Sequence, residues 1–404
     1  MMITVIYDST AKPGHNSEYI RHLIVYIKTS KLTTKETYVF ILHPTIIKRI
    51  GEESLTSIEA DSISIVPISE DVCSKVAIPD QMYSRYKNSF VEAHYINTQL
   101  LFFKAERLIL MFIDAELFTI KRISSPFLVE ITGIYLRPLP AIPYTTDLLI
   151  KRANQSLKRA IKILLIKYFL DAQKLKFVFI LDDNGLVTYL QKIIRTTKFI
   201  SLPDPFIRPV STGRYDPGLL HSLGVKQAYF LAFGVMEPRK NLLNIIKAFD
   251  AFTWSSTTPA IGLLIVGKFV SADYKREVVE LIDKTFLNRN VSVIVHDRFI
   301  DDTERDLVFA ESKAVLMPYL NFQCSSGLLG HAVMHNKPAI VGSLGLVGDL
   351  VSTYKLGISV NPNDVNQIRL AMQQALTFRL NRKLRDLFLQ TRTPNTFASI
   401  LLDY

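Results

Sequence analysis

Two short stretches of the chain combine residue types that could hold an anion. The first, Ser325-Ser326-Gly327, follows an apolar run over 313–317 and precedes a helical pattern over 328–334. A strand, a small-residue turn and a helix in this order place free backbone N–H groups and the positive end of the helix dipole at the carboxyl end of the strand. A phosphate group suits this position. The same residues also form an ordinary helix cap, and this alternative stays open.

The second stretch follows an apolar run over 229–233 and begins at Gly234. Gly234 lets the backbone approach a ligand, while Arg239 and Lys240 put two cations at the start of the next helix. A guanidinium fork and an ammonium point charge together suit a diphosphate. Asn241 is a further candidate contact. We expect both cations to be exposed, and a basic pair on a solvated helix start is the alternative.

The elements that must position these residues alternate along the chain. Apolar runs typical of buried strands occur at 3–7, 38–42, 63–66, 107–113, 177–181 and 198–202, and again at 229–233, 261–266, 291–295, 314–317, 339–341 and 358–360. Helical patterns fill the gaps, so each half predicts a parallel sheet with helices on both faces. We therefore predict an α/β protein of two Rossmann-like, doubly wound domains that face each other across a cleft.

Length and composition agree with two domains and an anionic ligand. A chain of 404 residues is too long for one core, and a Pro-, Gly- and Ser-rich stretch at 202–224 divides it. The net charge of +11 favours anionic partners. The two cysteines predict no disulfide framework and suit a reducing compartment. The sequence shows neither a transmembrane run nor a signal peptide, so we expect a cytoplasmic protein.

The motifs of the C-terminal half follow one another in a specific order between about 229 and 376. They are the strand followed by Gly-x-x-x-Pro-Arg-Lys-Asn, then Leu264-Ile265-Val266-Gly267, Met317-Pro318-Tyr319, the helix before Lys337-Pro338-Ala339-Ile340-Val341, and Gly357-Ile358 with Pro362. This order resembles the nucleotide-sugar half of family 4 glycosyltransferases, which have the GT-B fold. The N-terminal half is similar in outline, through Gly14-His15-Asn16 and Leu202-Pro203-Asp204-Pro205.

The resemblance implies roles for the two halves. Residues 206–379 would be the nucleotide-sugar donor domain and 1–205 the acceptor domain, with a tail from about 380 to 404 that packs back on the acceptor domain. It also implies that the anomeric configuration is retained and that neither a metal nor another cofactor is needed. The nucleoside diphosphate sugar is then the donor substrate.

The sequence departs from the family at a pair of positions eight residues apart. The family usually has two glutamates there, the first contacting donor-sugar hydroxyls and the second the ribose, and this chain has Gln323 and His331. Both side chains can still hydrogen-bond a hydroxyl, but neither has a fixed negative charge. The loss of both glutamates is also compatible with a member of this fold that has no catalytic activity. A helix histidine satisfied locally is the alternative for His331.

Other candidate residues follow predicted strands. Arg298 and Phe299 stand where the family holds the nucleobase, so that Arg298 would bond the base and Phe299 would pack on it, although a buried phenylalanine is the default. Gly14 and His15 form a turn that would face the donor phosphates and the acceptor, and a plain turn histidine is the alternative for His15. Asp114 would accept a proton from an acceptor hydroxyl, and capping the next segment is its alternative. Asp114-Ala-Glu116 is the nearest sequence to Asp-x-Asp and indicates no metal site by itself.

A basic amphipathic pattern covers residues 156–171. Leu157, Ile161, Leu164, Leu165 and Tyr168 recur at helical spacing, with several lysines and arginines off that stripe. Such a helix suits an anionic membrane surface, which would make the protein peripheral on the cytoplasmic face. A helix that faces the core with its apolar stripe is the default expectation.

We therefore predict a glycosyltransferase that moves a sugar from a nucleoside diphosphate sugar to a hydroxyl of a glycan, a lipid-linked sugar or a protein. Arg239, Lys240 and Ser325-Ser326-Gly327 would neutralise the leaving diphosphate, and Gln323 would orient the sugar. The alternative is a non-catalytic subunit of the same fold that binds a partner protein or a nucleotide sugar. We expect no nucleic-acid partner, because the basic residues are spread out and no such motif is present.

Overall fold

The chain folds into two compact units, which we describe separately. The structure, a computed structural model, describes residues 2–11, 16–30, 36–51, 62–76, 82–124, 129–136, 149–170, 175–206, 223–255, 261–287, 289–322 and 324–403. Unit 1 contains the described residues up to Pro205 and those from Thr393 onward, and unit 2 contains those from Phe206 to Arg392. Most of the expected linker at 202–224 lies outside the described residues.

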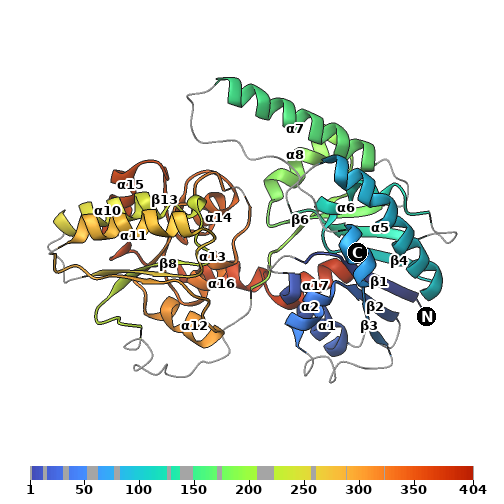
Figure 1. Cartoon of the computed structure of the whole chain (residues 1–404), viewed down its shortest axis with the longest axis horizontal. Helices are drawn as coiled ribbons and strands as arrows, with labels where there is room; N and C mark the ends of the chain where they lie inside the picture. Colours follow the sequence, from blue (N-terminus) through green and yellow to red (C-terminus); the bar gives the residue numbers. More distant parts are fainter. Residues whose placement is uncertain are drawn as a thin grey trace. The chain divides into compact units, whose positions relative to one another are not determined.

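Unit 1 is built on a seven-stranded sheet in which all neighbouring strands are parallel (Figure 1). Its strands are β1 (Met2–Asp8), β2 (Glu36–Leu42), β3 (Ile63–Pro67), β4 (Arg107–Leu110), β5 (Glu130–Ile134), β6 (Leu175–Leu181) and β7 (Phe199–Leu202), in the order β3-β2-β1-β4-β5-β6-β7. The sequence did not predict β5, which is short and has Gly133 near its end. It also extended β4 too far, because 111–113 already turn into the next helix.

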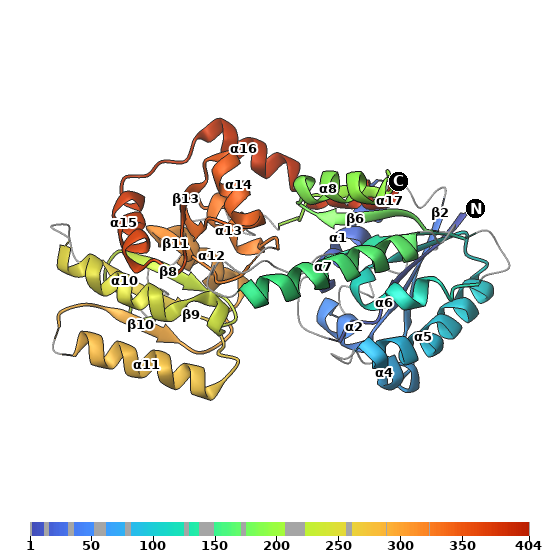
Figure 2. The ribbon, with the colours of Figure 1, turned by 90° about the horizontal axis from the view of Figure 1, so that it is seen from above.

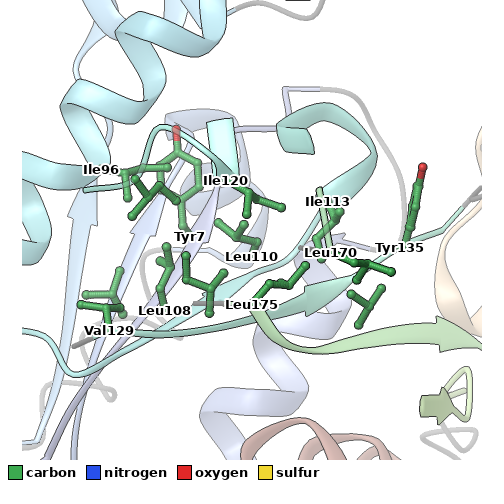
Figure 3. Packing of buried hydrophobic residues seen from close by; sticks show 14 of the residues in the cluster. Tyr7, Ile96, Leu108, Leu110, Ile113, Ile120, Val129, Tyr135, Leu170 and Leu175 are labelled. Carbon is green, nitrogen blue, oxygen red and sulfur yellow. The ribbon is translucent and has the colours of Figure 1, made fainter. Parts of the chain in front are cut away.

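Helices cover both faces of this sheet, and the C-terminal tail supplies one of them. They are α1 (Asn16–Thr29), α2 (Pro44–Ile50), α4 (Glu70–Val76), α5 (Met82–Phe103), α6 (Ile113–Ile120), α7 (Leu149–Leu170), α8 (Asn184–Ile194) and α17 (Pro394–Asp403). The core beneath α5 to α8 gathers buried side chains from several strands, among them Tyr7, Leu108 and Leu110 (Figure 3). On the opposite face α17 packs beside α1, where the rings of Tyr19 and Phe397 lie 4.9 Å apart.

Unit 2 repeats this plan with six parallel strands (Figure 2). Its strands are β8 (Tyr229–Phe233), β9 (Gly262–Val266), β10 (Val293–His296), β11 (Ala314–Met317), β12 (Ala339–Gly342) and β13 (Gly357–Val360), in the order β10-β9-β8-β11-β12-β13. Its helices are α10 (Leu242–Ser255), α11 (Ala272–Phe286), α12 (Asp302–Glu311), α13 (Gly327–Met334), α14 (Leu346–Tyr354), α15 (Val365–Ala375) and α16 (Arg382–Thr391).

The tail divides between the two units. Helix α16 belongs to unit 2, where Phe388 is buried and its ring stacks at 5.9 Å on that of Phe206. The chain returns to unit 1 at Thr393, and the guanidinium of Arg107 then donates hydrogen bonds to the carbonyls of Leu401 and Leu402. The boundary at about 380 taken from the sequence therefore differs from this division by one helix.

The strand order marks where each unit can bind a ligand. In both sheets the chain direction across the sheet reverses beside the first strand, between β1 and β4 in unit 1 and between β8 and β11 in unit 2. Ligands of doubly wound sheets bind beyond the carboxyl ends of the strands at such a switch point. Gly234 and Pro318 follow directly on β8 and β11, so the predicted anion-binding stretches both lie at the switch point of unit 2.

Candidate functional site

Two glycines bring the loops after β8 and β9 into backbone contact. Gly234 has a φ of +105° and its N–H donates to the carbonyl of Val266 at 3.0 Å. Gly267 has a φ of +145°, and a Cβ placed on it would lie 1.9 Å from the carbonyl oxygen of Gly234. Only glycine can occupy such a position. The contact holds the chain after β8 against the end of β9 and so fixes the start of the next turn.

That turn directs Lys240 inward. Residues Pro238–Lys240 form one 3₁₀ turn, which ends at Asn241 in the left-handed conformation with a φ of +64°. The side-chain amide of Asn241 donates to the carbonyls of Pro318 at 2.9 Å and Pro362 at 2.6 Å. Asn241 was expected to contact the ligand, but these two bonds use its amide to join the loops after β8, β11 and β13. It acts as a brace of the site.

Lys240 is buried, and the expectation that it is exposed is wrong. Its residue surface is only 7% exposed, and its Nζ donates to the hydroxyl of Tyr319 at 2.8 Å and to the carbonyl of Phe233 at 3.3 Å. Burial, and next the charge of Arg239, lower the pKa of Lys240 to about 7, against a smaller opposing effect of Glu237. A cation held this way lacks a full counter-charge, which a bound anion would supply.

Arg239 lies at the solvent side of the same turn. Its side chain is 38% exposed and pairs with Glu237, with 2.5 Å between the guanidinium nitrogen and the carboxylate oxygen. The guanidinium carbon also stands 5.0 Å from the centre of the Phe322 ring. Arg239 therefore keeps both an ion pair and an aromatic contact at the edge of the site, while Lys240 lies inside it.

Tyr319 connects Lys240 to the start of α13. Its buried hydroxyl accepts from Lys240 and lies near the side chain of Ser326, and burial raises the pKa of this phenol. Ser326 is the first residue before α13, yet its side chain does not cap the helix. We call Lys240, Tyr319 and Ser326 the clamp. The sequence analysis used Tyr319 only as part of a motif, so its role as the link was missed.

Only some of the other residues predicted to contact the donor lie within the described part of the chain. Ser325 and Gly327 flank Ser326 and are half-buried. His331 lies one turn into α13, half-buried, with its ring 5.5 Å from that of Phe309 in α12. Gln323, Gly14 and His15 lie outside the described residues, so their candidate roles stay predictions.

The loop after β10 presents an aromatic ring to solvent. Phe299 is 73% exposed, so its default as a core residue is wrong. Arg298 is engaged by both carboxylate oxygens of Glu304, at 2.8 and 2.5 Å, and this pairing raises the pKa of the guanidinium. Asp297 anchors the other side of the loop, and its hydrogen bond from Lys275 is the main cause that lowers its pKa to about 2. Phe299 therefore stands on a loop held from both sides.

Unit 1 places several carboxyl groups beside its own switch point. Asp114 lies in the first turn of α6 and not at a strand end, and its Oδ2 accepts from the backbone N–H of Leu136 at 2.6 Å. Glu116, which the sequence analysis considered only as part of Asp114-Ala-Glu116, and Glu92, which it did not single out, are buried nearby. Burial is the main cause that raises the pKa of both groups, which favours their neutral forms. Among the described residues no cluster of three or more His, Cys, Asp or Glu side chains could hold a metal ion.

Comparison with known proteins finds a family model that matches the C-terminal part of the chain. Residues 221–387 match the family model of glycosyl transferases group 1. This match covers β8 to β13 and therefore the whole clamp. No curated protein matches the chain significantly.

Solved structures match the whole chain in fold. A sucrose-phosphate synthase from Thermosynechococcus elongatus has a TM-score of 0.68 at 12% identity, over 99% of this chain and 96% of that one. A glycosyltransferase from Rickettsia africae ESF-5 also has 0.68 at 12%, over 100% and 97%. An E. coli structure described as trehalose-6-phosphate bound with UDP-2-fluoro glucose has 0.67 at 12%, over 100% and 98%. The predicted GT-B fold is confirmed, and within it residues 221–387 match the family model of glycosyl transferases group 1.

Proposed function

We propose that the protein transfers a sugar from a nucleoside diphosphate sugar to a hydroxyl group of its acceptor, and that the clamp binds the diphosphate. The observation that carries this proposal is Lys240, a buried lysine whose Nζ is hydrogen-bonded to Tyr319 near the start of α13. A lysine that costs free energy to bury is expected where a ligand later neutralises it. The E. coli neighbour was bound with a UDP sugar, which supports the same class of donor.

The clamp supplies what the leaving group requires. As the bond to the sugar breaks, negative charge grows on the diphosphate, and preorganised cations and N–H groups stabilise that charge. Lys240 would offer one cation, the N–H groups of the first turn of α13 would offer hydrogen bonds, and Arg239 would close the edge by exchanging Glu237 for the ligand. Each charge-assisted hydrogen bond of this kind contributes roughly 1.5–3 kcal/mol.

The remaining groups receive proposed roles from their positions. Phe299, exposed on an anchored loop, would pack on the nucleobase, while Arg298 would have to leave Glu304 to bond it. His331 would bond the ribose. Asp114 or a neighbouring carboxyl of unit 1 would receive the acceptor proton. We further propose retention of the anomeric configuration and no need for a metal or another cofactor, as the family resemblance implies. The acceptor hydroxyl would belong to a glycan, a lipid-linked sugar or a protein.

A second candidate function is a subunit that binds the nucleotide sugar without turnover. Gln323 and His331 favour it, because they replace the two glutamates usual in the family. A neutral amide and an imidazole still bond hydroxyls, but the fixed charges are lost. The two candidates share the clamp and differ in catalysis, so binding and turnover must be measured separately.

We predict that one nucleoside diphosphate stabilises the protein and that its sugar conjugate is consumed. The test is a thermal-shift panel of uridine, guanosine, adenosine and thymidine diphosphates, followed by release of the diphosphate from the matching sugar donors. A ligand at about 100 times its Kd contributes about 2.7 kcal/mol, which is a readily measured shift. Binding with release supports the enzyme, and binding without release at any donor supports the silent subunit. No shift with any member of the panel contradicts both.

A further inference from the structure

Helix α7 has two apolar stripes, of which only one packs on the core. Ile166, Phe169 and Leu170 are buried in unit 1. The second stripe faces away from them and consists of Leu157, Ile161, Leu164 and Tyr168, which are 60%, 44%, 66% and 57% exposed. This spacing of four, three and four residues forms a line along one helix face. The default expectation from the sequence, that the apolar stripe of residues 156–171 faces the core, is therefore wrong. Leu165, which was also assigned to that stripe, is half-buried.

Aromatic contacts link α5 through α6 to the buried stripe of α7. Tyr86 and Phe90 of α5 are exposed, and their rings meet edge to face at 5.5 Å. Phe118 of α6 joins the helices, with its ring 5.7 Å from that of Tyr86 and 5.3 Å from that of Phe169 in α7. Figure 1 shows α7 along the outside of unit 1, with α6 beneath it. We call the exposed side chains of α5 and α7 named here the α5–α7 face.

Cations stand directly on this face. The Nζ of Lys121 lies 3.4 Å from the centre of the Tyr168 ring, and the guanidinium carbon of Arg122 lies 4.0 Å from that of Phe90. The charges in the sequence of α7 are all positive. Its 22 residues contain no aspartate or glutamate but include Lys151, Arg152, Lys158, Arg159, Lys162 and Lys167. Exposed leucines and aromatic rings of α5 and α7 thus lie on a face that also carries the positive charges of Lys121 and Arg122.

We propose that the α5–α7 face binds the surface of an anionic membrane, with α7 lying in the interface. Such a surface offers both apolar acyl chains for the leucines and anionic headgroups for the lysines and arginines. An acidic protein partner would match the charge but would need an apolar surface of its own to bury the line of exposed leucines. In the described part of the chain no helix is long and apolar enough to cross a membrane, so α7 would lie flat. The proposal does not depend on the proposed reaction.

The test is co-sedimentation of the full chain with vesicles of phosphatidylcholine alone and of phosphatidylcholine mixed with phosphatidylserine. The protein should pellet with the anionic vesicles, less so as salt rises, and stay in solution with the neutral ones. The double variant Leu157→Ser, Leu164→Ser should lower the partition coefficient about 10-fold or more, because both leucines would leave the interface. Lys121→Gln and Lys167→Gln should each lower it about 5-fold with anionic vesicles.

A matched control uses exposed leucines of unit 2. Leu287 and Leu387 are 71% and 48% exposed, so the double variant Leu287→Ser, Leu387→Ser removes the same chemistry from another surface. Partition should stay as in the wild type, and unchanged circular dichroism should accompany all variants. The proposal is overturned if both double variants lose vesicle binding equally, and also if the wild type does not bind anionic vesicles. A third result would also overturn the proposal. If light scattering without vesicles shows that the wild type is a dimer and that the double variant Leu157→Ser, Leu164→Ser is a monomer, a second copy of the chain is the partner of this face.

Discussion

Replacing Lys240 by methionine should make unit 2 more stable and at the same time remove the positive charge from the clamp. The Lys240 side chain is buried, and the described groups around its Nζ are the Phe233 carbonyl and the Tyr319 hydroxyl, with Arg239 and Glu237 as the nearest charges. Methionine fills a similar volume without the cost of burying a charge. After subtraction of the lost hydrogen bonds we expect a gain of about 2–4 kcal/mol below pH 7.

The pH dependence of this gain follows from the sign of the pKa shift. The pKa of Lys240 falls to about 7 in the folded protein, whereas an unfolded lysine has about 10.4. Between these values the unfolded chain binds one more proton than the folded chain, so wild-type stability rises with pH in this window. Below about pH 7 Lys240 is protonated in the folded protein, which then has the full free-energy cost of the buried charge. The advantage of the methionine variant should therefore shrink as the pH increases from about 7 toward about 10.

Urea unfolding of the wild type and of Lys240→Met at about pH 6 and about pH 9 measures this difference. Trp254, the only tryptophan of the chain, lies in α10 of unit 2, and its ring contacts Arg289 at 4.3 Å. Its fluorescence therefore follows unit 2 alone. A variant that is less stable than the wild type at the lower pH, or an advantage that does not change with pH, would contradict the assignment of Lys240 as a destabilising buried cation.

Gly267→Ala should destabilise unit 2 by about 4 kcal/mol or more. Two causes add up at this position. An alanine would have to adopt a φ of +145°, and its Cβ would lie 1.9 Å from the carbonyl oxygen of Gly234. That neighbour is backbone at the end of β8, so it cannot move aside as a flexible side chain would. The loops after β8 and β9 would separate, and the turn that carries Lys240 would lose its support.

Gly224→Ala is the matched control for this prediction. Gly224 lies in the same unit with a φ of +71°, and among the described residues its Cβ would meet only the Cδ1 of Ile294, at 3.9 Å. The Gly224→Ala variant should lose only about 1–2 kcal/mol of stability, because the alanine must adopt a left-handed backbone conformation. Trp254 fluorescence in urea reports both variants. Similar midpoints for Gly224→Ala and Gly267→Ala would show that the close approach of the two loops is not important for stability.

The sheet architecture could be predicted from the sequence because parallel strands buried on both faces are continuous apolar runs. Tyr38 to Leu42 and Leu263 to Val266 are examples, and each is a strand of the structure. The missed strand β5, Glu130–Ile134, has only five residues, and its polar side chains interrupt the apolar pattern. Helix boundaries such as that of α6 depend on where the chain turns after β4, which local sequence does not determine.

The site was predictable in its location and not in its side-chain environment. The order of strand, Gly234, Arg239 and Lys240 placed the cations beyond β8, as the structure has them. The inward direction of Lys240 depends on Asn241 in a left-handed conformation and on bonds to Pro318 and Pro362, which are distant in sequence. The same applies to α7. Its periodicity revealed an apolar stripe, but only the packing of Ile166 and Phe169 shows that the stripe faces outward.

Binding of a nucleoside diphosphate as a function of pH tests the clamp most directly. Calorimetric titration of the diphosphate that binds best should give an affinity that falls about 10-fold for each pH unit above 7 in the wild type, since the anion binds the protonated form of Lys240. In Lys240→Met the affinity should be about 10- to 100-fold lower at pH 7 and nearly independent of pH. Wild-type affinity that stays constant between about pH 7 and pH 9, together with unchanged affinity in Lys240→Met, would contradict the account.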